Sequence, residues 1–201
     1  MTNLSLSLGL IALGANLPST TGSASVTLHA AISTLHNEKN ITITALSCFW
    51  KTPAVPHGSG PDFVNATAAI ATNLRSDEVL ERLHKIEADF GRDRSTGRWS
   101  ARVLDLDLIA FDDQIAPNHA TLEHWMALSQ NDQQIHTPSE LILPHPRMQD
   151  RGFVLAPLAQ IAPLWRHPLT GLSVIEMLGN LAPEATSGMQ PLADGFRASV
   201  P

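Results

Sequence analysis

Two aspartates separated by one residue are the clearest candidates for chemistry in this sequence. Asp105 and Asp107 lie within VLDLDLIAF, residues 103–111, the most strand-like run of the chain. Because side chains alternate faces along a strand, the two carboxylates point the same way, about 6.5–7 Å apart. Such a pair repels itself unless a divalent cation lies beside it. A solvent-facing strand edge would carry the same residues, but the flanking apolar side chains favour the metal site.

Arginines are concentrated immediately before this strand. Of the 13 basic residues in a chain of net charge −6, four arginines fall within residues 92–102; they are Arg92, Arg94, Arg98 and Arg102. Guanidinium groups grip phosphate oxygens in a fixed fork, so this segment is expected to bind a small anion. The alternative is a basic loop paired with acidic surface residues, but such pairs are worth only about 0–1 kcal/mol.

Phosphate-binding arginines beside metal-binding carboxylates are what ATP chemistry requires. The sequence has no Walker loop, because Ala15 and Asn16 follow Gly14 where Lys and Ser or Thr are needed. Glu87 lies beside the apolar stripe of a predicted helix, where it could contact a ligand or be a rim residue. His145 is held between two prolines, six residues before Arg151.

Composition limits the class of protein. The chain has 201 residues, 43% of them hydrophobic, which suits one domain with a real core. Its single cysteine, Cys48, cannot form an internal disulfide. No apolar run approaches the length of a membrane span, and no Lys or Arg precedes Lys39, so the apolar start is predicted to be a strand and the location cytoplasmic. The acidic charge argues against general nucleic-acid binding.

The elements alternate as β-α-β-β-α-β. Strands are predicted at 4–12, 41–49, 63–72 and 103–111, and helices at 24–36 and from the cap Ser76 to Gly91. This order predicts an α+β, ferredoxin-like fold in which an antiparallel sheet has two helices on one face and the other face free for a site.

The remaining chain is predicted to extend this domain to residue 180. Residues 112–139 have no clear period, and we expect a surface excursion that is dispensable for folding. A helix is predicted in RGFVLAPLAQIAP, and another from the cap Ser173 to Leu178. Residues 181–201 form a C-terminal tail that we expect to be partly disordered.

Several segments together resemble the 6-hydroxymethyl-7,8-dihydropterin pyrophosphokinase family of folate biosynthesis. They are IALGANLP, FWKTPAV, DFVNATAAI, IEADFGRDRSTGRWSARVLDLDLIAF and LPHPRMQDRGFVLAPLAQIAP, and they cover most of residues 8–163. The resemblance implies an enzyme that moves diphosphate from ATP to the pterin hydroxymethyl group and releases AMP. We expect a monomer without nucleic-acid or membrane partners.

The resemblance also implies roles for individual residues. Asp105 and Asp107 would hold two Mg²⁺ ions, while Arg92 and Arg102 would bind phosphate and assist transfer. The implied ATP contacts are His84, Glu87, Arg94, Trp99, Arg102, Leu108, His145 and Arg151. The implied pterin contacts are Thr52, Pro53, Val55, Phe63, Asn65, Trp99 and Phe153.

Two other readings of the same pattern remain open. A ferredoxin-like RNA-binding module would also have aromatic residues on its central strands, but the acidic charge and the aspartate pair oppose it. The second alternative is a different metal-dependent enzyme that transfers a phosphoryl group. Phe63, Asn65 and Phe153 favour a pterin, because a flat polar heterocycle suits stacking between two rings and one bidentate amide.

Overall fold

The computed structural model describes residues 5–54, 60–92, 102–129, 132 and 135–193 of the chain. Its centre is an antiparallel sheet with the strand order β5-β1-β4-β3-β6, in which β2 also pairs with β4. The strands are β1 (Ser7–Ala15), β2 (Ile41–Leu46), β3 (Trp50–Thr52), β4 (Phe63–Thr72), β5 (Asp105–Phe111) and β6 (Gln190–Pro191). The predicted α+β, ferredoxin-like core is confirmed.

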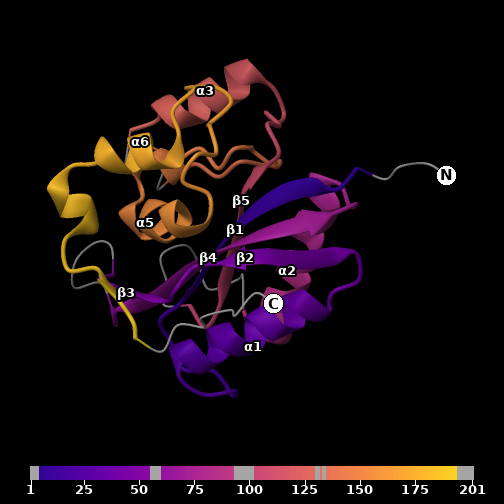
Figure 1. The fold of residues 1–201 in the computed structure, drawn as a ribbon, viewed down its shortest axis with the longest axis vertical. Helices are drawn as coiled ribbons and strands as arrows, with labels where there is room; N and C mark the ends of the chain where they lie inside the picture. The colour runs from indigo at the N-terminus through magenta and orange to yellow at the C-terminus, as the bar shows by residue number, and fades with distance from the viewer. Residues whose placement is uncertain (1–4, 55–59, 93–101, 130–131, 133–134, 194–201) are drawn as a thin grey trace.

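Helices α1 (Ala24–Asn37) and α2 (Ser76–Asp89) cover one face of the sheet (Figure 1). Ser23 caps α1 by accepting a hydrogen bond from the Val26 N–H. The cap of α2 is Arg75, so Ser76, predicted as the cap, is the first helical residue. Apolar residues of both helices form one core with the strands, including Leu28, Leu83 and Ile11.

The opposite face of the sheet is partly covered, which corrects the expectation that it is free. Helices α5 (Gly152–Ile161) and α6 (Val174–Gly179) build a second core there, in which Val154 and Leu158 pack with Leu10 and Ile109 of the sheet (Figure 1). The strands carry apolar side chains on both faces, so each face needs a cover. None of the described helices is long and apolar enough to cross a membrane.

Several strand boundaries differ from those predicted, and two of the differences have a structural reason. Strand β1 continues through Gly14 to Ala15, because Gly14 lacks the side chain that would meet the Asn65 Oδ1 at 2.7 Å. The predicted strand 41–49 ends early, as β2 at Leu46, and a separate strand, β3, begins beyond it at Trp50. Between them the Ser47 hydroxyl accepts the Thr67 N–H, so a side chain replaces part of the ladder.

Residues 112–139 contain a helix that the sequence did not predict. Helix α3 (His119–Ala127) is capped by Asn118, and its Leu122 side chain is 0% exposed. A β-bridge between Ala116 and Leu143 ties this segment to the chain before the short 3₁₀ helix η2 (Met148–Asp150). The segment therefore packs on the domain and is not only a surface excursion.

The predicted C-terminal tail contributes to the sheet. After α6, the chain forms the 3₁₀ helix η3 (Pro183–Thr186) and then β6, which pairs with β3. The described chain is thus ordered into secondary structure well beyond residue 180, where the predicted domain ended.

Candidate active site

The aspartate pair lies on the face of β5 that was predicted. Leu104, Leu106 and Leu108 are buried on the opposite face, whereas the side chains of Asp105 and Asp107 are 19% and 38% exposed. Asp105 is paired with Gly14 of β1, and Asp107 with Ala12. Because these neighbours are small, they leave space for a ligand on the sheet beside the two carboxylates.

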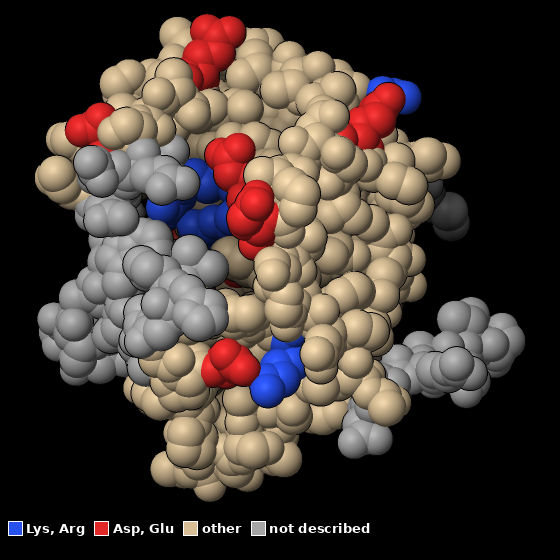
Figure 2. Space-filling model, turned by 90° about the vertical axis from the view of Figure 1, so that its left-hand side faces the viewer, with Lys and Arg blue, Asp and Glu red and all other residues tan. Residues whose placement is uncertain are grey.

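Three arginines surround the two carboxylates. Arg92 and Arg102 each donate to Asp105, and the Arg151 Nη1 lies 3.8 Å from the Asp107 Oδ2. Their side chains are 20%, 30% and 19% exposed, so the guanidinium groups are recessed. Figure 2 shows one hollow in which basic side chains lie below the surface with acidic ones at its edge.

Glu87 of α2 is a third carboxylate of the cluster and lies buried beneath Arg92. It is 0% exposed, and its Oε1 accepts the Leu106 N–H at 2.7 Å as well as Arg92. Burial lowers the pKa of Arg92, but the nearby Asp105 and Glu87 carboxylates outweigh it, so the net shift is upward and Arg92 stays charged. The sequence left Glu87 as a ligand contact or a rim residue, whereas the structure makes it the buried support of Arg92.

His145 is fixed so that one ring nitrogen faces the cluster. Its backbone N–H donates to the Ile109 carbonyl at 2.8 Å, and its Nδ1 accepts the Arg147 N–H at 3.1 Å. The Nε2 lies 3.5 Å from the Arg151 Nη1. Burial, with the positive charges of Arg151 and Arg147, holds the pKa of His145 well below its usual range. The ring is therefore neutral, and its proton resides on Nε2.

Arg151 connects this cluster to the aromatic residue Phe153. Arg151 precedes α5, and its guanidinium carbon lies 5.6 Å from the centre of the Phe153 ring. Burial lowers the pKa of Arg151, and the Asp107 and Asp105 carboxylates partly offset that effect. The start of α5 thus presents a cation that lies over the ring of Phe153.

A single cross-strand row joins the implied metal and pterin residues. Asp105 of β5 pairs with Gly14 of β1, Gly14 with Asn65 of β4, and Asn65 with Trp50 of β3. Directly paired residues share a face, so Asp105 and Asn65 project from the same side, two strands or about 10 Å apart. The Asn65 Nδ2 donates to the Thr52 Oγ1 at 2.7 Å.

The other predicted site residues are only partly brought together. Phe63 pairs with Thr52 and shares its face, and Pro53 follows in the chain. His84 is half-buried on α2, one turn before Glu87. Leu108 is buried in the core beneath α1 and α2, so its side chain does not reach the cluster. Val55, Arg94 and Trp99 lie outside the described residues.

Asn16 is a supporting residue that the motif analysis missed. It is 7% exposed, and its Oδ1 accepts the Arg102 N–H at 2.7 Å while its own backbone N–H donates to the Arg102 carbonyl. Its Nδ2 donates to the Pro61 carbonyl at 3.2 Å. One buried amide therefore positions Arg102 and the end of the loop before β4. The sequence placed it directly after Gly14 and Ala15, within the segment IALGANLP, but gave it no role.

The donor set fits magnesium. Among the described residues, no three His, Cys, Asp or Glu side chains converge as a metal cage, which leaves Asp105 and Asp107 as the candidates. Magnesium is commonly bound by one or two carboxylates, with water and phosphate oxygens as its remaining ligands. A pair of carboxylates beside phosphate-binding arginines therefore suits Mg²⁺ that arrives with a nucleotide.

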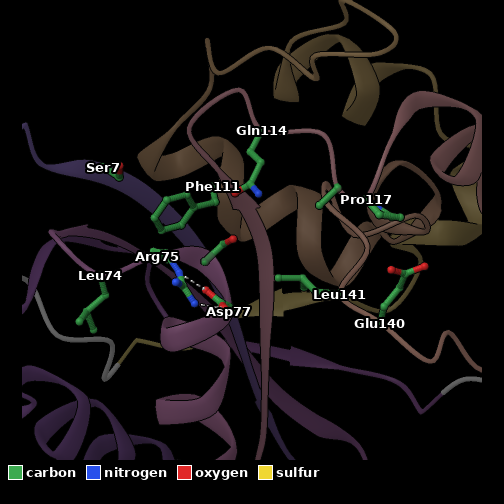
Figure 3. Close-up of a pocket in the computed structure, with 11 residues that line it drawn as sticks. Ser7, Leu74, Arg75, Asp77, Phe111, Gln114, Pro117, Glu140 and Leu141 are labelled. Carbon is green, nitrogen blue, oxygen red and sulfur yellow. Dashed lines mark hydrogen bonds and ion pairs between the residues drawn. The ribbon is translucent and has the colours of Figure 1, made fainter.

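A depression of about 540 Å³ lies elsewhere, between the start of α2 and the end of β5 (Figure 3). Arg75 and Asp77 pair with each other on its wall, and both are largely exposed. None of the predicted site residues lines it, so the chemistry is assigned to the arginine–aspartate cluster.

Comparison with known proteins identifies the family of the chain. Residues 10–163 match the family described as 7,8-dihydro-6-hydroxymethylpterin-pyrophosphokinase. The 2-amino-4-hydroxy-6-hydroxymethyldihydropteridine pyrophosphokinase of Bacillus subtilis is 36% identical over 151 residues, covering 75% of each chain. The protein of the same name from Methylorubrum extorquens is 32% identical over 173 residues, covering 86% of this chain and 92% of its own.

Solved structures show the same fold. The Plasmodium falciparum HPPK-DHPS structure with STZ-DHP superposes with a TM-score of 0.60 at 12% identity, covering 89% of this chain and 46% of that longer one. That likeness concerns the fold alone, whereas the sequence matches extend over most of the chain. The chain belongs to the 7,8-dihydro-6-hydroxymethylpterin-pyrophosphokinase family.

Proposed function

We propose that this chain transfers diphosphate from ATP to the hydroxymethyl group of 6-hydroxymethyl-7,8-dihydropterin in folate biosynthesis, producing AMP and the pterin diphosphate. The observation that carries the proposal is the cross-strand row, which places a carboxylate pair with three arginines about 10 Å from a buried amide. That separation suits a phosphate chain at one end of a site and a flat heterocycle at the other.

The positive and negative charges of the cluster are equal in number. When substrate binds, its phosphates and Mg²⁺ can therefore replace the ion pairs between the arginines and the aspartates. Three arginines face three carboxylates, namely Glu87, Asp105 and Asp107. Asp105 and Asp107 would hold Mg²⁺, for which we propose two ions, supplying charge neutralisation of the phosphate oxygens. Arg102 then turns from Asp105 to phosphate, while Arg92 stays anchored on Glu87.

His145 and Arg151 form a second contact for the nucleotide. The Nε2–H of the neutral His145 ring and the Arg151 guanidinium are both donors, and their nitrogens are 3.5 Å apart. Two donors at that distance are both satisfied when one phosphate oxygen accepts from each. We assign them to the phosphates of ATP.

The pterin is bound by side chains whose orientation is fixed by contacts within the protein. Asn65 uses one amide proton on Thr52, which leaves its Oδ1 and its second proton for the edge of the heterocycle. Phe63 and Phe153 are assigned to its two faces. Roles for Val55, Arg94 and Trp99 rest on the sequence resemblance alone, as do the contacts of Pro53, His84 and Leu108.

Among the residues that the structure describes, no side chain of the cluster is suited to act as a general base, since its carboxylates are committed to arginines or metal. Catalysis therefore depends on positioning and on stabilisation of charge in the transition state. The pterin hydroxyl oxygen forms a bond to the β-phosphorus and loses its proton to solvent, while the bond between the β-phosphorus and the α–β bridging oxygen breaks, so AMP leaves with that oxygen. Arg92, Arg102 and Arg151 neutralise the moving phosphates.

ATP labelled at the γ-phosphate tests the proposal. With Mg²⁺ and hydroxymethyl-dihydropterin, the label should reach the pterin in a diphosphate while AMP forms in equal amount. Accumulation of ADP, with a single phosphate on the pterin, would show γ-transfer and refute the assignment. We also propose a cytoplasmic monomer, which sedimentation of the purified protein checks for oligomeric state.

A further inference from the structure

The segment of residues 183–192, here named the C-terminal brace, lies beyond the family match, which ends at residue 163. In Figure 1 the chain descends from α6 to the edge of the sheet at β3. The brace comprises η3, the turn after it, β6 and Leu192. It is therefore an addition to the matched region that returns to the side of the sheet carrying the predicted pterin residues.

The first contact of the brace is with the start of α5. A Cβ added to Gly152 would lie 2.1 Å from the Ala185 carbonyl oxygen, so the backbones of α5 and η3 lie against each other. Gly152 stands directly between Arg151 and Phe153. The brace thus supports the turn of chain that presents one wall of the proposed pterin site.

The second contact is with the chain that follows β3. Gly188 has a φ of +74°, and a Cβ there would lie 3.0 Å from the Pro53 Cγ. Pro191 pairs with Trp50, which extends the cross-strand row by one strand. The Leu192 N–H donates to the Phe49 carbonyl at 2.7 Å and anchors the end of the brace. Thr52 and Pro53, on the other wall, are therefore held by the same segment.

We propose that the C-terminal brace sets the separation of the two walls of the pterin site, with Gly188 as a positioning residue for pterin binding. The walls come from chain segments about a hundred residues apart, and the brace touches both. Stacking is sensitive to such spacing, because a gap of about 0.5–1 Å forfeits a quarter to a half of the dispersion attraction. This inference rests on the proposed function, since it assumes that Phe153 and Thr52 bind the pterin.

Gly188→Ala tests the inference, with Gly171→Ala as its matched control. Both glycines have a left-handed φ, +74° and +70°, but a Cβ at Gly171 meets no atom within 4 Å. The backbone strain is therefore similar in both variants, and only Gly188→Ala presses on Pro53. Calorimetry with hydroxymethyl-dihydropterin, in the presence of Mg²⁺ and a nonhydrolysable ATP analogue, measures the pterin Kd.

Gly188→Ala should weaken pterin binding about threefold to tenfold, because a shift of a few tenths of an ångström is smaller than the 1 Å that costs about a hundredfold in a catalytic site. Its Kd for the ATP analogue alone, and both constants of Gly171→Ala, should match those of the wild type. A chain ending at Ala182, checked for its fold by circular dichroism, should show a larger loss in the same direction.

Equal weakening of pterin and ATP-analogue binding would overturn the inference, because a general loss of structure has no preference for one ligand. Unchanged pterin binding in both brace variants would also overturn it. Failure of the proposed function is separately visible, since the wild type would then bind ligands without releasing AMP.

Discussion

Replacing Glu87 by glutamine tests whether this buried acid sets the position of Arg92. The Glu87 side chain is 1% exposed and accepts both the Leu106 N–H and Arg92. Glutamine keeps an oxygen for the Leu106 N–H but presents no negative charge to Arg92. The variant should therefore fold, with Arg92 held by Asp105 alone.

The magnitude follows from the burial of the pair. Removing one partner of a buried ion pair costs about 3–5 kcal/mol when the other charge is left uncompensated. Arg92 keeps Asp105 and is 20% exposed, so we expect a smaller loss, about 2 kcal/mol of unfolding free energy. Glu87→Ala also removes the acceptor of the Leu106 N–H, which adds about 1–3 kcal/mol.

These losses are large enough to measure by thermal unfolding. In a chain of this size, 1 kcal/mol shifts the melting temperature by about 2–4 °C, so Glu87→Gln should melt about 4–8 °C lower. Glu87→Ala should lose roughly 6–20 °C on the same scale. Release of AMP should fall at least about tenfold in Glu87→Gln, because a displaced donor loses part of the roughly 100- to 1,000-fold that a removed one costs.

The control is Glu81→Gln, an exposed acid on the same helix, which should match the wild type in stability and activity. If Glu87→Gln behaved like that control, the support of Arg92 by Glu87 would be refuted. If it lost stability but kept full activity, Arg92 would not need its present position for the reaction.

Four other variants test separate parts of the structure. Asp107→Asn should retain the fold but lose about 100-fold or more in activity and require more Mg²⁺, because the metal supplies several kcal/mol of transition-state stabilisation. The control is Asp113→Asn at an exposed position, and equal activity of the two variants would exclude the metal role of Asp107. Asn65→Ala should weaken pterin binding by about 1–3 kcal/mol in calorimetry and leave ATP binding unchanged, unlike the exposed control Asn73→Ala; equal loss for both ligands would contradict the pterin assignment. Leu122→Ala should cost about 2–5 kcal/mol in urea unfolding, since its side chain is 0% exposed, whereas the exposed Ile135→Ala should cost little; a neutral Leu122→Ala would mean that α3 is dispensable. His167 is buried, which lowers its pKa from 6.5 to about 4. Its contribution to stability is therefore complete above pH 6.5 and decreases as the pH falls toward 4, where the unfolded chain binds the proton and the folded one does not. His167→Asn, which can still accept the N–H groups after it, should show a flatter pH dependence of urea unfolding, and an unchanged slope would assign that dependence to other groups.

The central elements could be predicted because each is periodic over its own length. The apolar stripe of α2 and the β-branched run of β4 are local patterns, and β4 has the bounds that the sequence indicated, residues 63–72. The early end of the predicted strand 41–49 at Leu46, with β3 starting only at Trp50, could not be predicted in this way. This break depends on Ser47, whose hydroxyl accepts an N–H from Thr67, twenty residues further along.

Helix α3 illustrates a different limit. Its sequence, HATLEHWMA, carries one fully buried residue, Leu122, so it lacks the repeated apolar stripe that identifies a helix. Its cap Asn118 is visible in the sequence, but a cap without a stripe is also typical of a turn. Packing against the rest of the domain decides the conformation, and a single sequence does not contain that information.

The candidate site likewise contains residues that local geometry predicts and residues that depend on contacts between distant segments. The shared face of Asp105 and Asp107 could be predicted because alternate residues of one strand point the same way by covalent geometry alone. The functions of Glu87 and Asn16 depend on contacts between segments, since Glu87 meets Leu106 across 19 residues and Asn16 meets Arg102 across 86. Both are buried polar groups whose hydrogen bonds end on the backbone or on the arginines of the cluster. Burying such groups is costly unless every bond is made, so each constrains the arginine segment at one point. The two arginines beside Asp105 are therefore held from below by an acid of α2 and from the side by an amide at the end of β1, which leaves their outward side for phosphate.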